Sequence, residues 1–116
     1  MRDLKPKFLF YKMEINKLKS MLGFAAKARK LAAGAELTLS AIRGKKAQLV
    51  LVAADVSENT RKRLTNCCEF YETECFAVGF TIGELGHIIG KHGGTACLAV
   101  IDSGFAQTIR NIINDK

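Results

Sequence analysis

The stretch QLVLVAADVSENT, residues 48–60, decides the fold of this chain. After one glutamine, residues 49–54 are all aliphatic, and a strand that is apolar on both faces is normally central, with helices above and below it. The polar residues that follow include Ser57, whose hydroxyl suits the N-cap of a helix running to about Tyr71. The stretch therefore predicts a buried central strand followed by a helix that covers it.

Helical and strand patterns alternate on both sides of this central unit. Such alternation implies an α/β fold in which helices cover both faces of one sheet. The other expected elements are a helix at 14–33 that stops at Gly34, a helix at about 37–44, a strand at 74–78, a helix from the capping box of Thr81 and Glu84 to Ile89, a strand at 95–101, and a last helix that starts at 102–104.

The size and charge of the chain narrow its function. Its 116 residues suffice for one hydrophobic core, so we expect a single domain at 13–116 and a poorly ordered extension at 1–12. Residues 1–63 contain fifteen basic and five acidic side chains, whereas residues 64–116 contain three and six. A polyanionic partner explains such an excess, because Lys and Arg displace the counterions of phosphate groups.

Several classes of protein are not supported by the sequence. No apolar run reaches the length of a membrane span, and residues 1–12 do not resemble a secretion signal, so we expect a cytoplasmic protein. The four cysteines, Cys67, Cys68, Cys75 and Cys97, form no C-x-x-C pair and suit buried thiols better than zinc ligands. Neither a P-loop nor a dinucleotide fingerprint is present, and we expect no metal and no cofactor.

The sequence leaves one enzymatic alternative open. Asp55 and Asp102 follow the two most apolar strands, and parallel strands would bring both carboxylates to one crevice. A Mg²⁺ ion or a phosphoryl group could then bind between them. The simpler interpretation is that each aspartate begins a turn into a helix, where the positive end of the helix dipole favours an acidic side chain.

Three loops are better candidates for a binding surface. Gly34–Thr38, Ala54–Ser57 and Gly90–Gly94 offer backbone N–H groups at helix starts or in glycine-rich backbone, and such groups bind phosphates or base edges. Aromatic residues are few, which disfavours a stacking platform for single strands and favours shape-led recognition of structured RNA. The basic residues near the first two loops in the chain are Lys27, Arg29, Lys30, Arg43, Lys45, Lys46, Arg61 and Lys62.

Several of these segments together resemble the ribosomal protein L7Ae/L30e superfamily, most closely its small bacterial branch. The matching segments are MLGFAAKARKLAAG (21–34), AIRGKKAQLVLVAADVSENT (41–60), ELG (84–86), IGK (89–91) and LAVIDSGFA (98–106). The resemblance spans about residues 16–113. It implies a three-layer α/β/α sandwich with a mixed four-stranded sheet. It also implies non-catalytic binding of kink-turn or related structured RNA, in ribosomes or ribonucleoproteins.

The resemblance also implies where RNA would bind. The family pattern there is Gly-x-Asn-Glu-x-x-Lys, in which Gly34 matches and Glu36, Leu37 and Ser40 replace the three polar residues. The RNA-binding residues expected from the resemblance, the loops and the charge are Arg29, Lys30, Gly34, Ala35, Glu36, Leu37, Ser40, Lys45, Asp55, Val56, Glu84, Lys91, His92, Gly93 and Gly94. The expected partners are ribosomal RNA or a kink-turn, with ribosomal proteins as additional partners. The alternative is a protein-interaction module of the same fold without RNA contacts.

Overall fold

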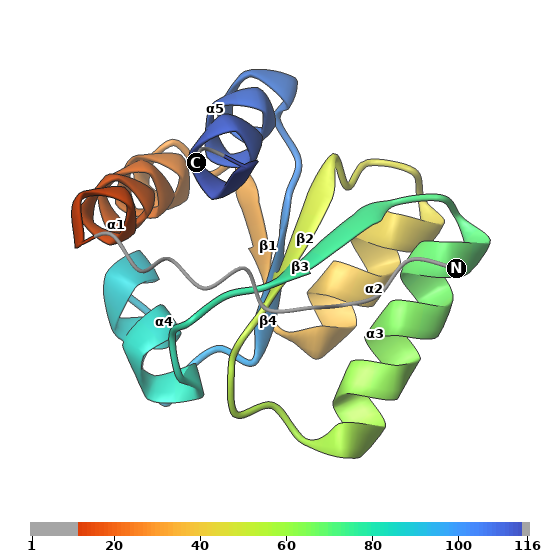
Figure 1. Cartoon of the computed structure of the whole chain (residues 1–116). Coiled ribbons are helices and arrows are strands. Elements are labelled where there is room, and N and C mark those ends of the chain that lie inside the picture. The colour runs from red at the N-terminus through yellow and green to blue at the C-terminus, as the bar shows by residue number, and fades with distance from the viewer. Residues whose placement is uncertain (1–11, 115–116) are drawn as a thin grey trace.

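The computed structural model describes residues 12–114, and the extension expected at 1–12 lies outside this range except for Lys12. The described elements are, in chain order, α1 (Lys12–Lys27), β1 (Leu31–Ala33), α2 (Ala35–Arg43), β2 (Leu49–Val52), α3 (Glu58–Phe70), β3 (Glu74–Ala77), α4 (Ile82–Ile89), β4 (Cys97–Val100) and α5 (Ser103–Asn114). Figure 1 shows how these elements form layers.

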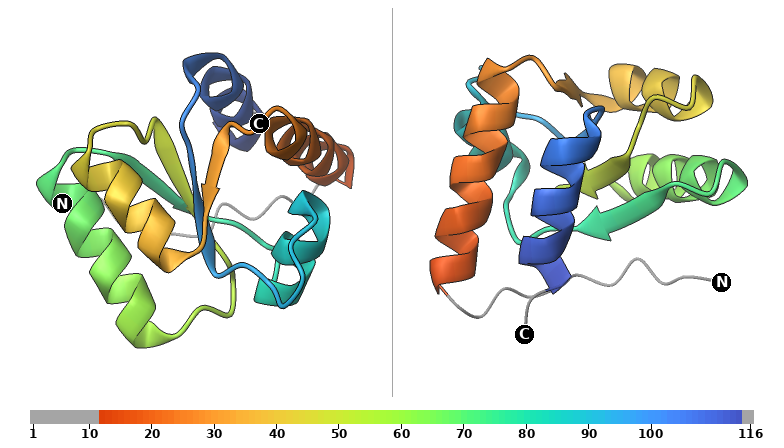
Figure 2. Two further views of the ribbon diagram at one scale, coloured as in Figure 1. Left: turned by 180° about the vertical axis from the view of Figure 1, so that it is seen from behind. Right: turned by 90° about the horizontal axis from the view of Figure 1, so that it is seen from above.

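The four strands form one mixed sheet in the order β1-β4-β2-β3. Strand β2 is parallel to β3, and β4 is antiparallel to both of its neighbours, β1 and β2. Helices α1, α4 and α5 cover one face of the sheet, and α2 and α3 cover the other (Figures 1 and 2). The prediction of an α/β/α sandwich with a mixed four-stranded sheet is therefore confirmed.

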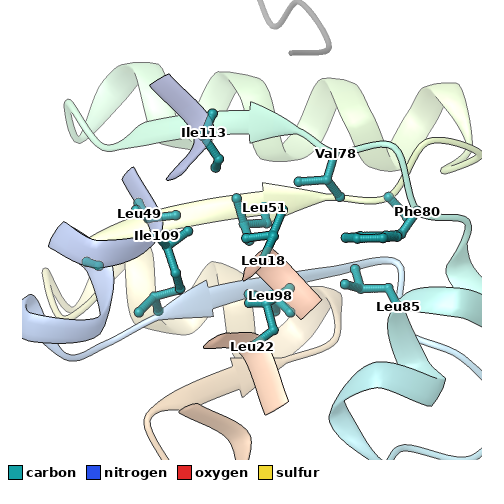
Figure 3. Packing of buried hydrophobic residues seen from close by; sticks show 13 residues of the cluster. Leu18, Leu22, Leu49, Leu51, Val78, Phe80, Leu85, Leu98, Ile109 and Ile113 are labelled. Atoms are coloured by element: carbon teal, nitrogen blue, oxygen red, sulfur yellow. The ribbon is translucent and has the colours of Figure 1, made fainter. Parts of the chain in front are cut away.

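The central strand explains why the sandwich has two cores. Successive side chains of a strand point to opposite faces. Leu49 and Leu51 of β2 accordingly pack with the helices α1, α4 and α5, where Figure 3 shows Leu51 beside Leu18 and Leu98. Val50 and Val52 pack on the other face with α2 and α3. All four residues of β2 are fully buried, as the aliphatic run predicts.

The first predicted helix ends earlier than its apolar pattern suggested. Helix α1 stops at Lys27, and Arg29 takes a left-handed backbone conformation with φ of 61°. The N–H groups of Arg29 and Lys30 donate to the carbonyls of Ala26 and Ala25, which is the Schellman ending of a helix. Residues 31–33 then pair with β4 as a strand. Gly34, predicted to stop this helix, is instead the N-cap of α2.

The enzymatic alternative fails on the topology of the sheet. Because β4 is antiparallel to β2, Asp55 and Asp102 lie at opposite ends of the sheet. Each carboxylate accepts a hydrogen bond from backbone: Asp55 from the N–H of Ile82 at 2.7 Å, and Asp102 from the N–H of Phe105 at 2.9 Å. The two aspartates therefore cannot form a shared site. The simpler interpretation holds for Asp102 at the start of α5, whereas Asp55 binds the start of α4 and not that of α3, whose N-cap is Ser57.

Candidate nucleic-acid interface

Backbone hydrogen bonds bring the three candidate loops together at one end of the sheet. The N–H of Gly34 donates to the carbonyl of Cys97, and that of Ala53 donates to the carbonyl of Ala96, both at 2.8 Å. The N–H of Thr95 donates to the carbonyl of Ile82 at 3.0 Å, beside the contact between Ile82 and Asp55. We call the surface formed by Gly34–Leu37, Asp55–Ser57 and Gly90–Thr95 the loop edge.

Three helices begin at the loop edge, and only α2 begins without a capping side chain. The hydroxyl of Ser57 accepts from the N–H of Thr60 at the start of α3, and Thr81 with Glu84 forms a complete capping box on α4. The N-cap of α2 is Gly34, which has no side chain to accept a hydrogen bond. The first backbone N–H of α2 with a partner in the helix is that of Thr38, which donates to Gly34. The N–H groups of residues 35–37 are therefore free to bind acceptor atoms of a ligand.

Contacts of Thr38 with the sheet hold the start of α2 in place. Thr38 is fully buried, and its hydroxyl donates to the carbonyl of Ala32 in β1 at 3.2 Å. The thiol of Cys97 in β4 contacts the same hydroxyl at 3.6 Å. These contacts anchor α2 to the two strands beside it, so the free N–H groups have a fixed direction before any ligand binds. A preorganised site of this kind loses little conformational entropy on binding.

Two of the three side chains that depart from the family pattern, Glu36 and Leu37, are exposed in the first turn of α2. Glu36 lies 3.7 Å from the guanidinium of Arg63 in α3, and both side chains are exposed. Leu37 is exposed over 57% of its surface, although it is apolar. Arg63 was absent from the residues predicted for RNA binding, because only the parallel packing of α2 and α3 brings it to the loop edge. Its guanidinium lies beside the carboxylate of Glu36 in the first turn of α2.

Asp55 and Glu84, both predicted RNA-binding residues, already bind backbone N–H groups. Asp55 accepts from Ile82, and Glu84 accepts from the N–H of Thr81 at 2.9 Å within its capping box. Both residues therefore position the loops, and Val56 beside Asp55 is half-buried against the α2 and α3 core. The hydroxyl of Thr95 in the third loop is buried and has no hydrogen-bond partner among the described residues.

The glycine-rich loop is packed tightly at one end and open at the other. A Cβ on Gly86 of α4 would lie 2.5 Å from the Cα of Gly94, and a Cβ on Gly94 would lie 2.6 Å from a methyl carbon of Ile82. Gly93 has open space around it, but its φ of 85° favours glycine. Lys91 and His92, between these glycines and α4, are exposed. The loop is thus fixed to α4 through Gly94 and presents 91–93 to solvent.

We predict that Gly86→Ala destabilises the protein by about 1–3 kcal/mol, because the new methyl group overlaps the backbone of the glycine-rich loop. Urea unfolding followed by far-UV circular dichroism measures this difference. Gly79→Ala is the matched control: a Cβ there meets nothing within 4 Å, so the change in unfolding free energy should stay under about 0.5 kcal/mol. Equal stability of both variants would contradict the close packing of α4 on this loop.

Three predicted phosphate contacts are not at the loop edge. Arg29 and Lys30 precede β1, and Lys45 follows the C-terminus of α2, so all three lie at the opposite end of the sheet. The prediction that they stand beside the loops was wrong, because strand β1 and helix α2 each carry the chain from one end of the sandwich to the other. Ser40 is exposed on α2, one turn after the residues of the loop edge.

The cysteines have the character of packed thiols. A hydrogen bond with Cys75, together with burial, raises the pKa of the Cys68 thiol, and burial raises the pKa values of Cys67 and Cys97. Protonated thiols are poor nucleophiles and poor metal ligands. Among residues 12–114, no group of three or more His, Cys, Asp or Glu side chains is arranged to hold a metal ion.

The described part of the chain has no helix long and apolar enough to cross a membrane.

Two curated bacterial proteins are similar to the chain over most of its length. It is 38% identical over 97 residues to RNA-binding protein YlxQ of Enterococcus faecium, covering 84% of this chain and 91% of that protein. It is 36% identical over 94 residues to RNA-binding protein YlxQ of Bacillus subtilis, covering 81% and 92%.

Solved structures agree with this similarity. A protein of unknown function from Bacillus halodurans superposes with a TM-score of 0.78 at 32% identity, covering 85% of this chain and 98% of the other. The fold alone is shared with the 15.5 kD RNA-binding protein of Giardia lamblia, at a TM-score of 0.73 and 19% identity, covering 94% and 93%. The two YlxQ relatives, both named RNA-binding proteins, confirm the expectation of a binding protein rather than an enzyme. The sequence model of the ribosomal protein L7Ae/L30e/S12e/Gadd45 family matches residues 16–110, and the chain belongs to this family.

Proposed function

We propose that this protein binds structured RNA at the loop edge, without catalysing a reaction. Kink-turn or kink-turn-like RNA is the ligand class, and the protein works in the cytoplasm, on ribosomal RNA or with the translation machinery. The observation that carries the proposal is the uncapped start of α2, whose free N–H groups at 35–37 lie at the junction of three loops. Unpaired backbone donors at a helix N-terminus favour phosphate oxygens and base acceptors.

The electrostatics of the loop edge suit selective rather than tight binding. The loop edge itself contains Lys91, Glu36 and Asp55, and the first turns of α3 and α4 add Arg61, Lys62 and Arg63 together with Glu58 and Glu84. Arg61 pairs with Glu58 at 2.7 Å, and this contact lowers the pKa of Glu58. Acidic and basic side chains therefore balance at the loop edge and the adjoining helix starts, so selectivity there depends on hydrogen bonds and shape, while the individual cations supply phosphate contacts.

The names of the relatives support RNA as the ligand. Both YlxQ proteins are called RNA-binding proteins, and the chain covers more than nine-tenths of each. The departures from the family pattern at Glu36, Leu37 and Ser40 bear on which RNA is preferred. They leave the fold of the loop edge intact, since Gly34 and the buried Thr38 are present.

We predict that the purified protein binds a kink-turn RNA with steep salt dependence. If it contacts about five phosphates in all, the logarithm of the association constant falls with the logarithm of salt at a slope of roughly −3.5 to −4.5. Fluorescence anisotropy at several salt concentrations measures this slope. Absence of binding at low salt would reject RNA as the ligand, and co-purification with a ribosomal protein instead would favour an interaction module of the same fold.

A further inference from the structure

Among residues 12–114, six basic side chains without an ion pair gather at the end of the sandwich opposite the loop edge. We call this surface the basic end; it comprises Lys27, Arg29, Lys30, Arg43, Lys45 and Lys46. These residues follow the C-termini of α1 and α2 or lie in their last turns. In Figure 1 the chain leaves α1 and α2 on the side away from the starts of α2 and α3. All six side chains are exposed.

None of the six forms an ion pair with another described residue. The ion pairs within 12–114 involve Arg61, Arg63 and Arg110 instead. Four acidic groups lie near this end of the fold, and two of them are engaged with other groups. Asp102 accepts from the backbone of Phe105, and Glu74 pairs with Arg110. Glu69 and Glu72 lie at the end of α3, which leads into the edge strand β3.

Backbone contacts place the basic residues of α1 and α2 on the same surface. The N–H of Ile101, after β4, donates to the carbonyl of Lys30 at 2.9 Å. On the other side of β4, the N–H of Gln48 donates to the carbonyl of Val100 at 2.7 Å. Lys30 and the segment before β2 are thus two strand spacings apart, about 10 Å. One phosphodiester backbone can contact the cations on both sides of β4.

Two residues of the basic end, Arg29 and Lys45, adopt a left-handed backbone conformation that favours glycine. Arg29 and Lys45 have φ values of 61° and 58°, and each occupies the left-handed position of a Schellman ending. The helix dipole favours a cation there. A cation is nevertheless not required by the ending, because Glu72 occupies the same position after α3 with φ of 57°. The helix endings therefore do not explain the basic side chains of Arg29 and Lys45, whereas an anionic ligand at this surface would.

We propose that the basic end binds the phosphate backbone of a second RNA segment, a duplex separate from the RNA bound at the loop edge. The inference rests on the proposed RNA binding and extends it from one surface to two. The two surfaces lie at opposite ends of the sheet, in a molecule whose extents are 33 × 28 × 27 Å. A compact motif held at the loop edge leaves the basic end accessible to another RNA helix. The protein then bridges two RNA segments, reading one by hydrogen bonds and holding the other by charge.

The test uses the full chain and two labelled RNAs. A short-stemmed kink-turn RNA carries a fluorescence donor, and a plain A-form duplex of about 16 base pairs carries the acceptor. With kink-turn RNA saturating, the wild type should bind the duplex and give energy transfer. The variant Arg29→Gly/Lys45→Gly should bind the duplex about tenfold more weakly, with a salt slope shallower by about 1.8, because two phosphate contacts are lost. It should bind the kink-turn within about twofold of wild type and melt no lower, because glycine suits both positions.

Two controls separate a local surface from overall charge. Glu72→Gly changes the same backbone position after α3 and should leave duplex binding unchanged or slightly stronger. Lys17→Ala/Lys19→Ala removes two exposed cations of α1 outside the basic end and should weaken duplex binding less than the glycine pair does. Equal losses in both double variants, or no duplex binding by the wild type, would overturn the inference. Duplex binding that depends on Arg29 and Lys45, without any kink-turn binding, would support the basic end and reject the proposed function of the loop edge.

Discussion

Ala35→Pro is expected to weaken binding of kink-turn RNA about 10- to 100-fold without lowering the stability of the protein. Ala35 is the first residue of α2, so its N–H makes no bond within the helix, and proline is favoured at this position. Gly34 has ψ of 157°, an extended value compatible with a following proline. The substitution removes one free N–H, and a hydrogen bond to a charged acceptor contributes roughly 1.5–3 kcal/mol.

Fluorescence anisotropy measures the affinity of this variant, and urea unfolding measures its stability. Ala35→Ser is the matched control, since it changes the side chain and keeps the N–H; it should bind within about threefold of wild type, well inside the effect of one hydrogen bond. If the proline variant is stable and binds kink-turn RNA as tightly as the serine variant does, the free N–H groups of α2 do not contact RNA. RNA binding would then have to use other groups of the loop edge than the uncapped start of α2.

The second large expected effect is a gain in affinity for kink-turn RNA. Glu36→Asn/Leu37→Glu/Ser40→Lys restores the polar pattern of the family, and we expect the affinity for kink-turn RNA to rise about tenfold, or about 1.4 kcal/mol. An amide at 36 offers both a donor and an acceptor to a base edge, whereas the present carboxylate offers acceptors only and repels phosphate. The substitution also frees Arg63 from its contact with Glu36.

A single variant, Ser40→Lys, distinguishes recognition from charge. An added lysine alone should strengthen binding to kink-turn and plain duplex RNA alike, because phosphate contacts carry no sequence information. The triple variant should prefer the kink-turn. If the triple variant gains nothing over wild type, and wild type already binds the kink-turn tightly, the departures at these three positions do not limit recognition.

Local chemistry determined which parts of the fold could be predicted from the sequence. The run at 49–52 became a fully buried central strand, and Ser57 and Thr81 cap the helices that their patterns predicted. The end of α1 was missed because Arg29 adopts the left-handed conformation that the prediction reserved for Gly34. Strand β1 has only three residues, and its pairing with β4 is a long-range contact that no local pattern encodes.

At the candidate site, too, local signals could be read from the sequence and long-range packing could not. Gly34 and the three loops were predicted from helix starts and glycines, which are local signals. The direction of β4 is not a local signal, and it separates Asp55 from Asp102. Arg29, Lys30 and Lys45 were assigned to the wrong end of the sheet because β1 and α2 each carry the chain from one end to the other. Arg63 was missed because its approach to Glu36 depends on how two helices pack.

A titration of ¹⁵N-labelled protein with kink-turn RNA tests whether RNA binds at the loop edge. Two-dimensional amide spectra report each backbone N–H separately. We expect the largest shifts at 35–37, with further shifts at 55–57 and 90–95, when a short-stemmed kink-turn is added. Shifts confined to 27–30 and 43–46 under the same conditions, with the start of α2 unaffected, would contradict binding at the loop edge.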